Sequence, residues 1–173
     1  MAKLDEVLRL VRLYEEKYRH PNLTRFLVSS KYDLFPEKEN MGNCWPQCYP
    51  YADRPGVYLI MDGNENVLYI GKSSVAIGGR LGSYFCYDGE RKCQVRSPYW
   101  STSPKYIVVI AVPFDSAFEC AALEEFLLAN VRTADNSVFQ RKNRHKAQRK
   151  AKFYINKCRS ASCMQGGLKQ ASA

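Results

Sequence analysis

Apolar side chains recur at intervals of three and four residues through residues 3–19, the first periodic stretch of the chain. These side chains are Leu4, Leu8, Val11, Tyr14 and Tyr18. Two acids stand in the first turn, and Pro21 follows the end of the stretch. This spacing places the apolar positions on one face of a helix. We therefore expect an amphipathic helix that packs on another part of the protein.

Two β-rich runs flank a short polar turn in the middle of the chain. The runs are residues 56–61 and 67–71, and the turn between them reads Asp-Gly-Asn-Glu-Asn. Such runs around a Gly/Asn turn predict a β-hairpin. Residues 105–112 form a further apolar run that ends at Pro113, and we expect it to be a third strand.

Two helices are expected between and after these strands, a short one at residues 77–85 and a long one at residues 116–132. Ser116 and Glu119 have the spacing of a capping box, which predicts where the long helix begins. The chain therefore mixes helices and strands, as an α+β protein does. No internal repeat is visible.

Residues 31–55 interrupt the periodic pattern with prolines set among tyrosine, cysteine and tryptophan. The prolines are Pro36, Pro46, Pro50 and Pro55. This composition is typical of an ordered irregular segment rather than of a flexible linker. We expect the segment to wrap around the core that follows.

One carboxylate, Glu124, falls on the apolar side of the long helix when each residue advances by about 100°. The apolar arc around it consists of Ala117, Cys120, Ala121, Leu127, Leu128 and Val131. A carboxylate that faces a core costs several kcal/mol unless something neutralises it. A buried ion pair with Arg80 or Lys72 and a role as metal ligand remain equally open. Glu119 is assigned to the helix cap and Glu125 to the surface.

Further polar candidates gather on the hairpin and the short helix. Tyr58 and Tyr69 lie on the two hairpin strands, and Lys72 follows the second strand. Arg80 and Tyr84 are four residues apart and so share a helical face. Strand tyrosines are usually packing residues and a single arginine is usually on the surface. It is their combination that indicates a site.

The formal net charge of +9 is concentrated at the C-terminal end. Residues 136–173 contain ten Lys and Arg and no acid, so the rest of the chain is close to neutral. The densest stretch is Arg141, Lys142, Arg144, Lys146, Arg149, Lys150 and Lys152. As a helix it would carry bases on every side and would bind a polyanion readily. The alternative is that the stretch is a solvent-exposed helix whose charges only keep it soluble.

The seven cysteines and the hydropathy of the chain indicate in which cellular compartment the protein is expected. An odd number of cysteines fits reduced thiols better than a disulfide framework. A zinc site drawing on Cys44, Cys48 and His20 is the less favoured alternative, because the paired spacing of zinc ligands is missing. No apolar run approaches the roughly 20 residues that cross a bilayer. The N-terminus lacks the pattern of a secretory signal. We expect a cytoplasmic protein that does not contact membranes.

These residues resemble the GIY-YIG nucleases over residues 54–137. Residues 56–58 read Gly-Val-Tyr and residues 69–71 read Tyr-Ile-Gly, similar to the two triplets of the family. Arg80, with Tyr84 four residues on, is similar to the family's catalytic Arg segment. Glu124, with Asn136 twelve residues on, is similar to its Glu-bearing helix. Two departures are Val57 in the first triplet and Thr-Ala-Asp at residues 133–135, where a proline turn is frequent.

The resemblance implies a fold and a set of site residues. The fold is α+β, with a small three-stranded antiparallel sheet flanked by helices. An N-terminal arm at residues 1–53 and a basic tail at residues 138–173 would flank the core. The implied catalytic residues are Tyr58, Tyr69, Lys72, Arg80, Tyr84, Glu124 and Asn136. Glu124 would hold Mg²⁺, with Mn²⁺ as the alternative, and Tyr69 is favoured as base with Tyr58 orienting the water.

The resemblance also implies a function, a metal-dependent endonuclease that hydrolyses phosphodiester bonds. Its partner would be double-stranded DNA, contacted by the basic tail, and cutting both strands favours a homodimer. The flanking arms favour sequence selection of a restriction or mobile-element type. A repair or structure-specific nuclease, a catalytically silent nucleic-acid-binding module and an interaction protein held together by its cysteines remain alternatives.

Overall fold

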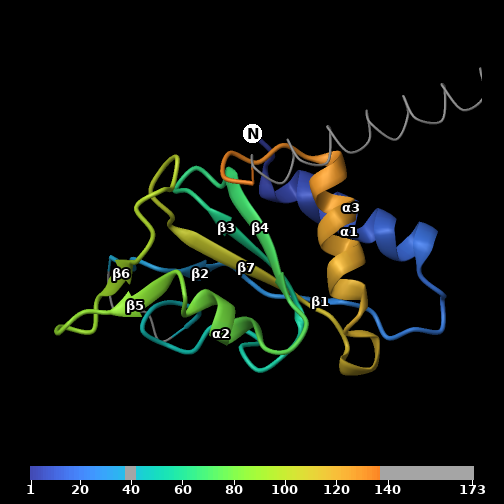
Figure 1. Ribbon diagram of the computed structural model, residues 1–173, viewed down its shortest axis with the longest axis horizontal. Coiled ribbons are helices and arrows are strands. Elements are labelled where there is room, and N and C mark those ends of the chain that lie inside the picture. The colour runs from blue at the N-terminus through green and yellow to red at the C-terminus, as the bar shows by residue number, and fades with distance from the viewer. Residues whose placement is uncertain (38–41, 137–173) are drawn as a thin grey trace, which may run out of the picture. The chain divides into compact units, whose positions relative to one another are not determined.

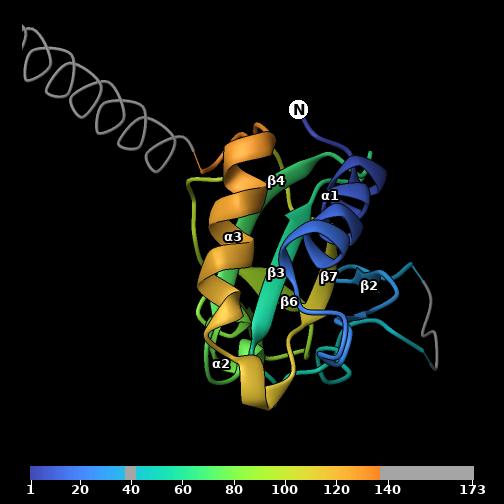
Figure 2. The same cartoon turned by 90° about the vertical axis from the view of Figure 1, so that its right-hand side faces the viewer.

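The computed structural model describes residues 1–37 and 42–136 as three layers built around an antiparallel sheet (Figure 1). Helices α1 and α3 cover one face of the sheet, and helix α2 with the hairpin β5–β6 covers the other (Figures 1 and 2). The helices are α1 (Leu4–Tyr18), α2 (Ile77–Leu81) and α3 (Glu119–Asn130). The strands are β1 (Leu27–Val28), β2 (Tyr32–Asp33), β3 (Gly56–Met61), β4 (Val67–Ser73), β5 (Phe85–Tyr87), β6 (Cys93–Val95) and β7 (Tyr106–Ala111).

The three long strands lie in the order β7-β3-β4, all antiparallel. The α+β fold, the hairpin and the third strand predicted from the sequence are thereby confirmed. Two further strands, β1 and β2, both pair with the outer edge of β7. Each has only two residues, which is too short for an alternating pattern to be recognised in the sequence.

Strand β3 has all six residues buried because both of its faces are covered. Its side chains alternate between the two layers, as they do in any strand. Tyr58 and Ile60 belong to the cluster under α2 and β5, together with Phe85 and Ile107. This explains why the sequence of the central strand is continuously apolar and why its tyrosine is buried.

The helix predicted at residues 3–19 is confirmed as α1, and it packs against α3. The ring of Phe126 lies 5.3 Å from that of Tyr14 and 5.5 Å from that of Tyr18. Beyond the end of α1, Arg19 forms a buried ion pair with Glu119 at 2.8 Å. The N-terminal arm is thus joined to the helix that carries Glu124.

The predicted capping box is wrong. The hydroxyl of Ser116 lies in a 3₁₀ turn (Phe114–Ser116) and donates to the carbonyl of Pro113 at 3.4 Å. Helix α3 begins at Glu119, and the residue before it, Phe118, makes no side-chain cap. Glu119 is held by Arg19 and therefore cannot fold back onto the helix terminus.

The short predicted helix is also shorter than expected. Helix α2 ends at Leu81, and Phe85 already begins β5, which pairs with β6. A turn whose N–H groups bind α2 carbonyls at Arg80 and Leu81 separates the two elements. The β5–β6 hairpin was missed because neither of its three-residue strands has a clear alternation.

The proline-rich segment packs along the β5–β6 layer, as the composition suggested. Trp45 is 7% exposed, and its indole N–H donates to the carbonyl of Arg91 at 2.7 Å. The hydroxyl of Tyr32 donates to the carbonyl of Gln47 at 2.6 Å. Across residues 1–37 and 42–136, no helix has both the length and the apolar character needed to cross a membrane.

Candidate active site

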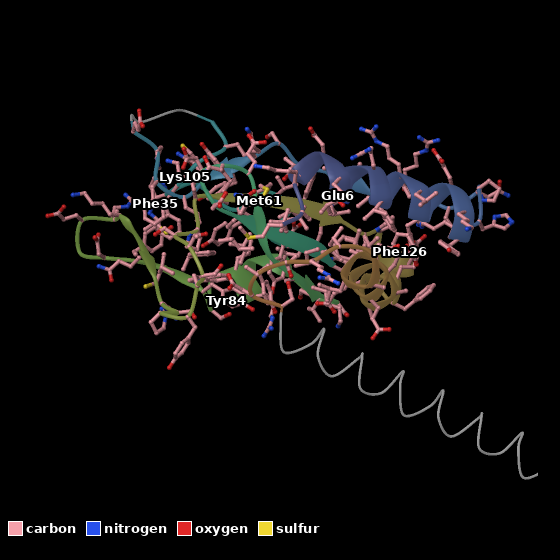
Figure 3. All side chains as sticks on the ribbon, turned by 90° about the horizontal axis from the view of Figure 1, so that it is seen from above. Glu6, Phe35, Met61, Tyr84, Lys105 and Phe126 are labelled. Atoms are coloured by element: carbon pink, nitrogen blue, oxygen red, sulfur yellow. The ribbon has the colours of Figure 1, made fainter. Side chains whose placement is uncertain are left out.

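Three tyrosines from two strands and one turn form the centre of the site. Tyr58 on β3 and Tyr69 on β4 lie on the same face of the hairpin, and Tyr84 follows α2. The three ring centroids are 5.9 to 6.3 Å apart. The hydroxyls of Tyr58 and Tyr84 lie 3.4 Å apart. Figure 3 shows Tyr84 on the side of the molecule away from α1.

Gly71 makes room for this arrangement. It lies directly opposite Tyr58 in the β3–β4 register. A Cβ atom at Gly71 would approach the Tyr58 hydroxyl oxygen to 2.5 Å and the Tyr69 ring to 2.7 Å. The glycine is required here because two aromatic rings pass over its backbone.

Replacing Gly71 by Ala is expected to displace the Tyr58 ring, which is fully buried and has no free space to enter. Overpacking of this kind costs about 1–3 kcal/mol of unfolding free energy. Urea unfolding measures that loss. The matched control is Gly79→Ala in α2, where a Cβ atom meets nothing within 4 Å. Equal stability of the two variants would contradict the packing role of Gly71.

Arg80 projects from α2 toward the tyrosines and is itself exposed. Its interaction with Tyr58, and then with Tyr84, raises the pKa of the guanidinium above its ordinary value. The side chain is fixed in charge at any physiological pH. A permanent cation therefore stands beside three phenols at an accessible surface.

Glu124 lies half-buried on α3, near Lys72 and Arg80. Its carboxylate forms no hydrogen bond and no ion pair within the part of the chain that the structure describes, so the ion pair considered from the sequence is not formed. Burial raises the pKa of Glu124, while the charges of Lys72 and Arg80 oppose the rise. Glu125 is exposed, as predicted. Glu124 is a desolvated carboxylate available for a ligand.

Burial is also the main influence on two of the phenols. It raises the pKa of Tyr58 and of Tyr69 well above the ordinary value, and interactions with Tyr84 add to the rise. Both hydroxyls are therefore protonated at neutral pH. In this state Tyr69 can orient a water molecule but cannot take its proton, so the base role expected for Tyr69 requires a pKa lowered by a bound cation.

The comparison with known families agrees with this geometry. Residues 54–137 match the family model of the GIY-YIG catalytic domain. This part of the chain belongs to the GIY-YIG family. No curated protein and no solved structure matches the chain.

In the GIY-YIG domain, the side chain of Asn136 is bonded to the backbone of β4. The side-chain oxygen of Asn136 accepts the N–H of Ile70 at 2.8 Å, and its nitrogen donates to the carbonyl of Ile70 at 2.9 Å. Beside it, the N–H of Asp135 donates to the carbonyl of Leu68 at 2.9 Å. Asn136 therefore fixes the backbone of the edge strand that carries Tyr69.

Trp100 belongs to the site and was missed by the sequence analysis. Its ring lies 6.0 Å from that of Tyr69 and 5.8 Å from that of Tyr84, and it stacks on Phe85. Its buried indole N–H has no partner among the residues described. Trp100 lies in a polar loop far from the family triplets, and no local pattern marks it as part of the site.

The donor set of the GIY-YIG domain fits a hard divalent cation. One carboxylate without a protein partner is the arrangement that Mg²⁺ uses when it keeps several waters. In the described ranges, no group of three or more His, Cys, Asp and Glu side chains could hold a metal ion, so no zinc site forms at Cys44, Cys48 and His20. The basic residues predicted to bind DNA, from Arg141 to Lys152, lie outside the described residues.

Proposed function

We propose that this GIY-YIG nuclease is a Mg²⁺-dependent endonuclease that hydrolyses phosphodiester bonds of double-stranded DNA. The observation that carries the proposal is the half-buried carboxylate of Glu124, which has no partner in the described part of the chain and lies in the electrostatic range of Arg80 and Tyr69. A protein that only bound DNA would gain nothing from a desolvated acid beside a phosphate-binding arginine.

Each residue of the cluster has a task in this reaction. Arg80 pairs with the phosphate and offsets the negative charge that develops on its oxygens. Glu124 holds the cation, which when bound polarises the phosphate and eases formation of hydroxide. Tyr69 and Tyr84 orient the attacking water through their hydroxyls. Tyr58 is fully buried and acts through its contact with Tyr84.

Lys72 and Asn136 support these groups. Lys72 lies close enough to Glu124 to oppose the rise in its pKa, and so favours the ionised carboxylate that a cation needs. Asn136 forms hydrogen bonds with both the N–H and the carbonyl of Ile70, and these bonds keep the neighbouring Tyr69 in position. The proposal therefore assigns Lys72 to electrostatics and Asn136 to position.

The proposal extends to target choice by residues outside the GIY-YIG core. The basic tail, Arg141 to Lys152, would contact DNA phosphates, which makes binding sensitive to salt. A second copy of the chain would allow both strands to be cut. We propose sequence selection of the restriction or mobile-element type, because arms on both sides of a small core provide surface for reading bases.

Incubation of supercoiled plasmid with the full chain tests the proposal. Nicked or linear product is expected with Mg²⁺ or Mn²⁺ and none with EDTA. Linear product without a nicked intermediate would indicate a dimer, and discrete ends on mapped fragments would indicate sequence selection. If the chain bound DNA but did not cleave it with any divalent cation, the alternative of a catalytically silent binding module would be supported instead.

A further inference from the structure

An aromatic-walled cavity of about 490 Å³ lies between the β5–β6 hairpin and the proline-rich segment. Its walls include the rings of Trp45, Tyr49, Phe85 and Tyr87, and Arg96 stands at its edge. This volume falls in the range of pockets that hold small organic ligands. None of these side chains belongs to the tyrosine cluster around Arg80.

The rings of the cavity are held in place by their own polar groups. The indole N–H of Trp45 donates to a backbone carbonyl at 2.7 Å, and the Tyr87 hydroxyl donates to the carbonyl of Pro46 at 3.3 Å. The two rings lie 4.7 Å apart, and Tyr49 lies 6.2 Å from Trp45. Tyr87 is nevertheless 57% exposed. A preformed aromatic surface is thus presented to an incoming flat group.

Arg96 supplies charge at the same place. It is exposed, and its guanidinium makes no ion pair or hydrogen bond to any other residue that the structure describes. Its backbone N–H donates to the carbonyl of Tyr84 at 2.8 Å, which fixes the start of its side chain beside the catalytic turn. A cation without a counter-ion next to stacked rings complements a nucleotide, with its apolar base and anionic phosphate.

The cavity and the tyrosine cluster meet in the short segment that joins α2 to β5. Gly82, which follows the last residue of α2, lines the cavity together with Phe85. Tyr84 lies between these two residues in the chain and belongs to the tyrosine cluster, with which Arg80 also interacts. Consecutive Cα atoms are about 3.8 Å apart and Arg80 is close to Gly82 in the chain, so a strand whose phosphate meets Arg80 needs only a few nucleotides to reach the cavity.

We propose that this cavity binds one unstacked base of single-stranded DNA a few nucleotides from the cleaved phosphate. The base stacks on Tyr87, and Arg96 pairs with its phosphate. The inference rests on the proposed function in taking DNA as the ligand. It adds a preference for substrates that have an unpaired segment next to the duplex.

Binding of short oligonucleotides to the full chain tests the proposal without cleavage. Glu124→Gln prevents cutting, and Trp100→Phe leaves Trp45 as the one tryptophan of the chain. In this background an eight-nucleotide oligothymidylate is expected to quench the fluorescence of Trp45. An abasic oligonucleotide of equal length carries the same phosphates and should bind without that quenching.

Variants of the cavity give the second readout. Tyr87→Ala should weaken binding of the oligothymidylate by about 5- to 100-fold, as the loss of one base–aromatic stack does. Tyr99→Ala is the matched control, because Tyr99 is 88% exposed and lies outside the cavity. Arg96→Gln should weaken binding of both oligonucleotides, and Arg9→Gln on α1 serves as its control.

Two outcomes would overturn the proposal. One is equal quenching by the abasic oligonucleotide, and the other is no greater loss from Tyr87→Ala than from Tyr99→Ala. Failure of the proposed function looks different. In that case the wild-type chain would leave every DNA intact while the cavity still bound the oligothymidylate.

Discussion

Replacing Glu124 by Gln is expected to lower the rate of DNA cleavage by about 10³-fold, the upper end of the scale seen when one group that stabilises transition-state charge is removed. The amide keeps the size of the side chain but cannot supply the negative charge that a divalent cation requires. Arg80→Ala should lower the cleavage rate by roughly 10²- to 10³-fold, because the variant lacks the cation that offsets the charge developing on the phosphate oxygens. Plasmid cleavage under saturating Mg²⁺ measures both effects.

The stability of the Glu124→Gln variant gives an independent readout. Burial raises the pKa of Glu124 in the folded protein, so the fold prefers the protonated acid. The contribution of Glu124 to stability is therefore greatest in acid and is lost as pH rises through its raised folded pKa. The metal-free Gln variant should be the more stable protein at neutral pH and equal to the wild type in acid.

Addition of Mg²⁺ should reverse that order. A ligand that binds only the folded state raises stability by mass action, and only the wild type offers the carboxylate. Thermal melts with and without Mg²⁺ measure the difference. Glu125→Gln is the matched control, since that neighbour is exposed on the same helix. Full cleavage by Glu124→Gln, or equal Mg²⁺ stabilisation of both proteins, would remove Glu124 from the site.

Removing one partner of the Arg19–Glu119 pair is expected to cost about 3–5 kcal/mol of unfolding free energy, the usual effect of leaving a buried charge unpaired. Two nitrogens of Arg19 donate to the carboxylate at 2.8 to 3.1 Å, and the residues are only 8% and 5% exposed. Urea unfolding of Arg19→Ala and Glu119→Ala measures the loss. The pair joins the N-terminal arm to the start of α3, so both variants should also loosen the helix that carries Glu124.

Two comparisons separate this buried pair from ordinary surface charge. Replacing both partners by apolar residues, Arg19→Met with Glu119→Leu, should recover most of the lost stability because no charge is left unpaired. The exposed pair Lys31–Glu65 is the control, and Lys31→Ala should cost less than about 1 kcal/mol. A double variant no more stable than Arg19→Ala would show that the pair's geometry, and not burial of charge, governs stability here.

The local patterns of the chain were sufficient for the main elements and for the partial burial of Glu124. Helical spacing identified α1, and β-rich runs identified the β3–β4 hairpin and β7, since each element is long enough to be recognised from its own residues. The helical position of Glu124 inside an apolar arc distinguished it from Glu125, and the structure places Glu125 at the surface. These are features in which each residue's neighbours in sequence are also its neighbours in space.

Tertiary structure alone decided what each polar group meets. Glu119 had the spacing of a cap, but its partner Arg19 lies one hundred residues away in the chain. Gly71 and Tyr58 are brought together by strand register, and Asn136 reaches the backbone of Ile70 across 66 residues. Local periodicity specifies which face of an element is apolar. It contains no information about which distant group will approach that face, because this depends on how the packed layers fit together.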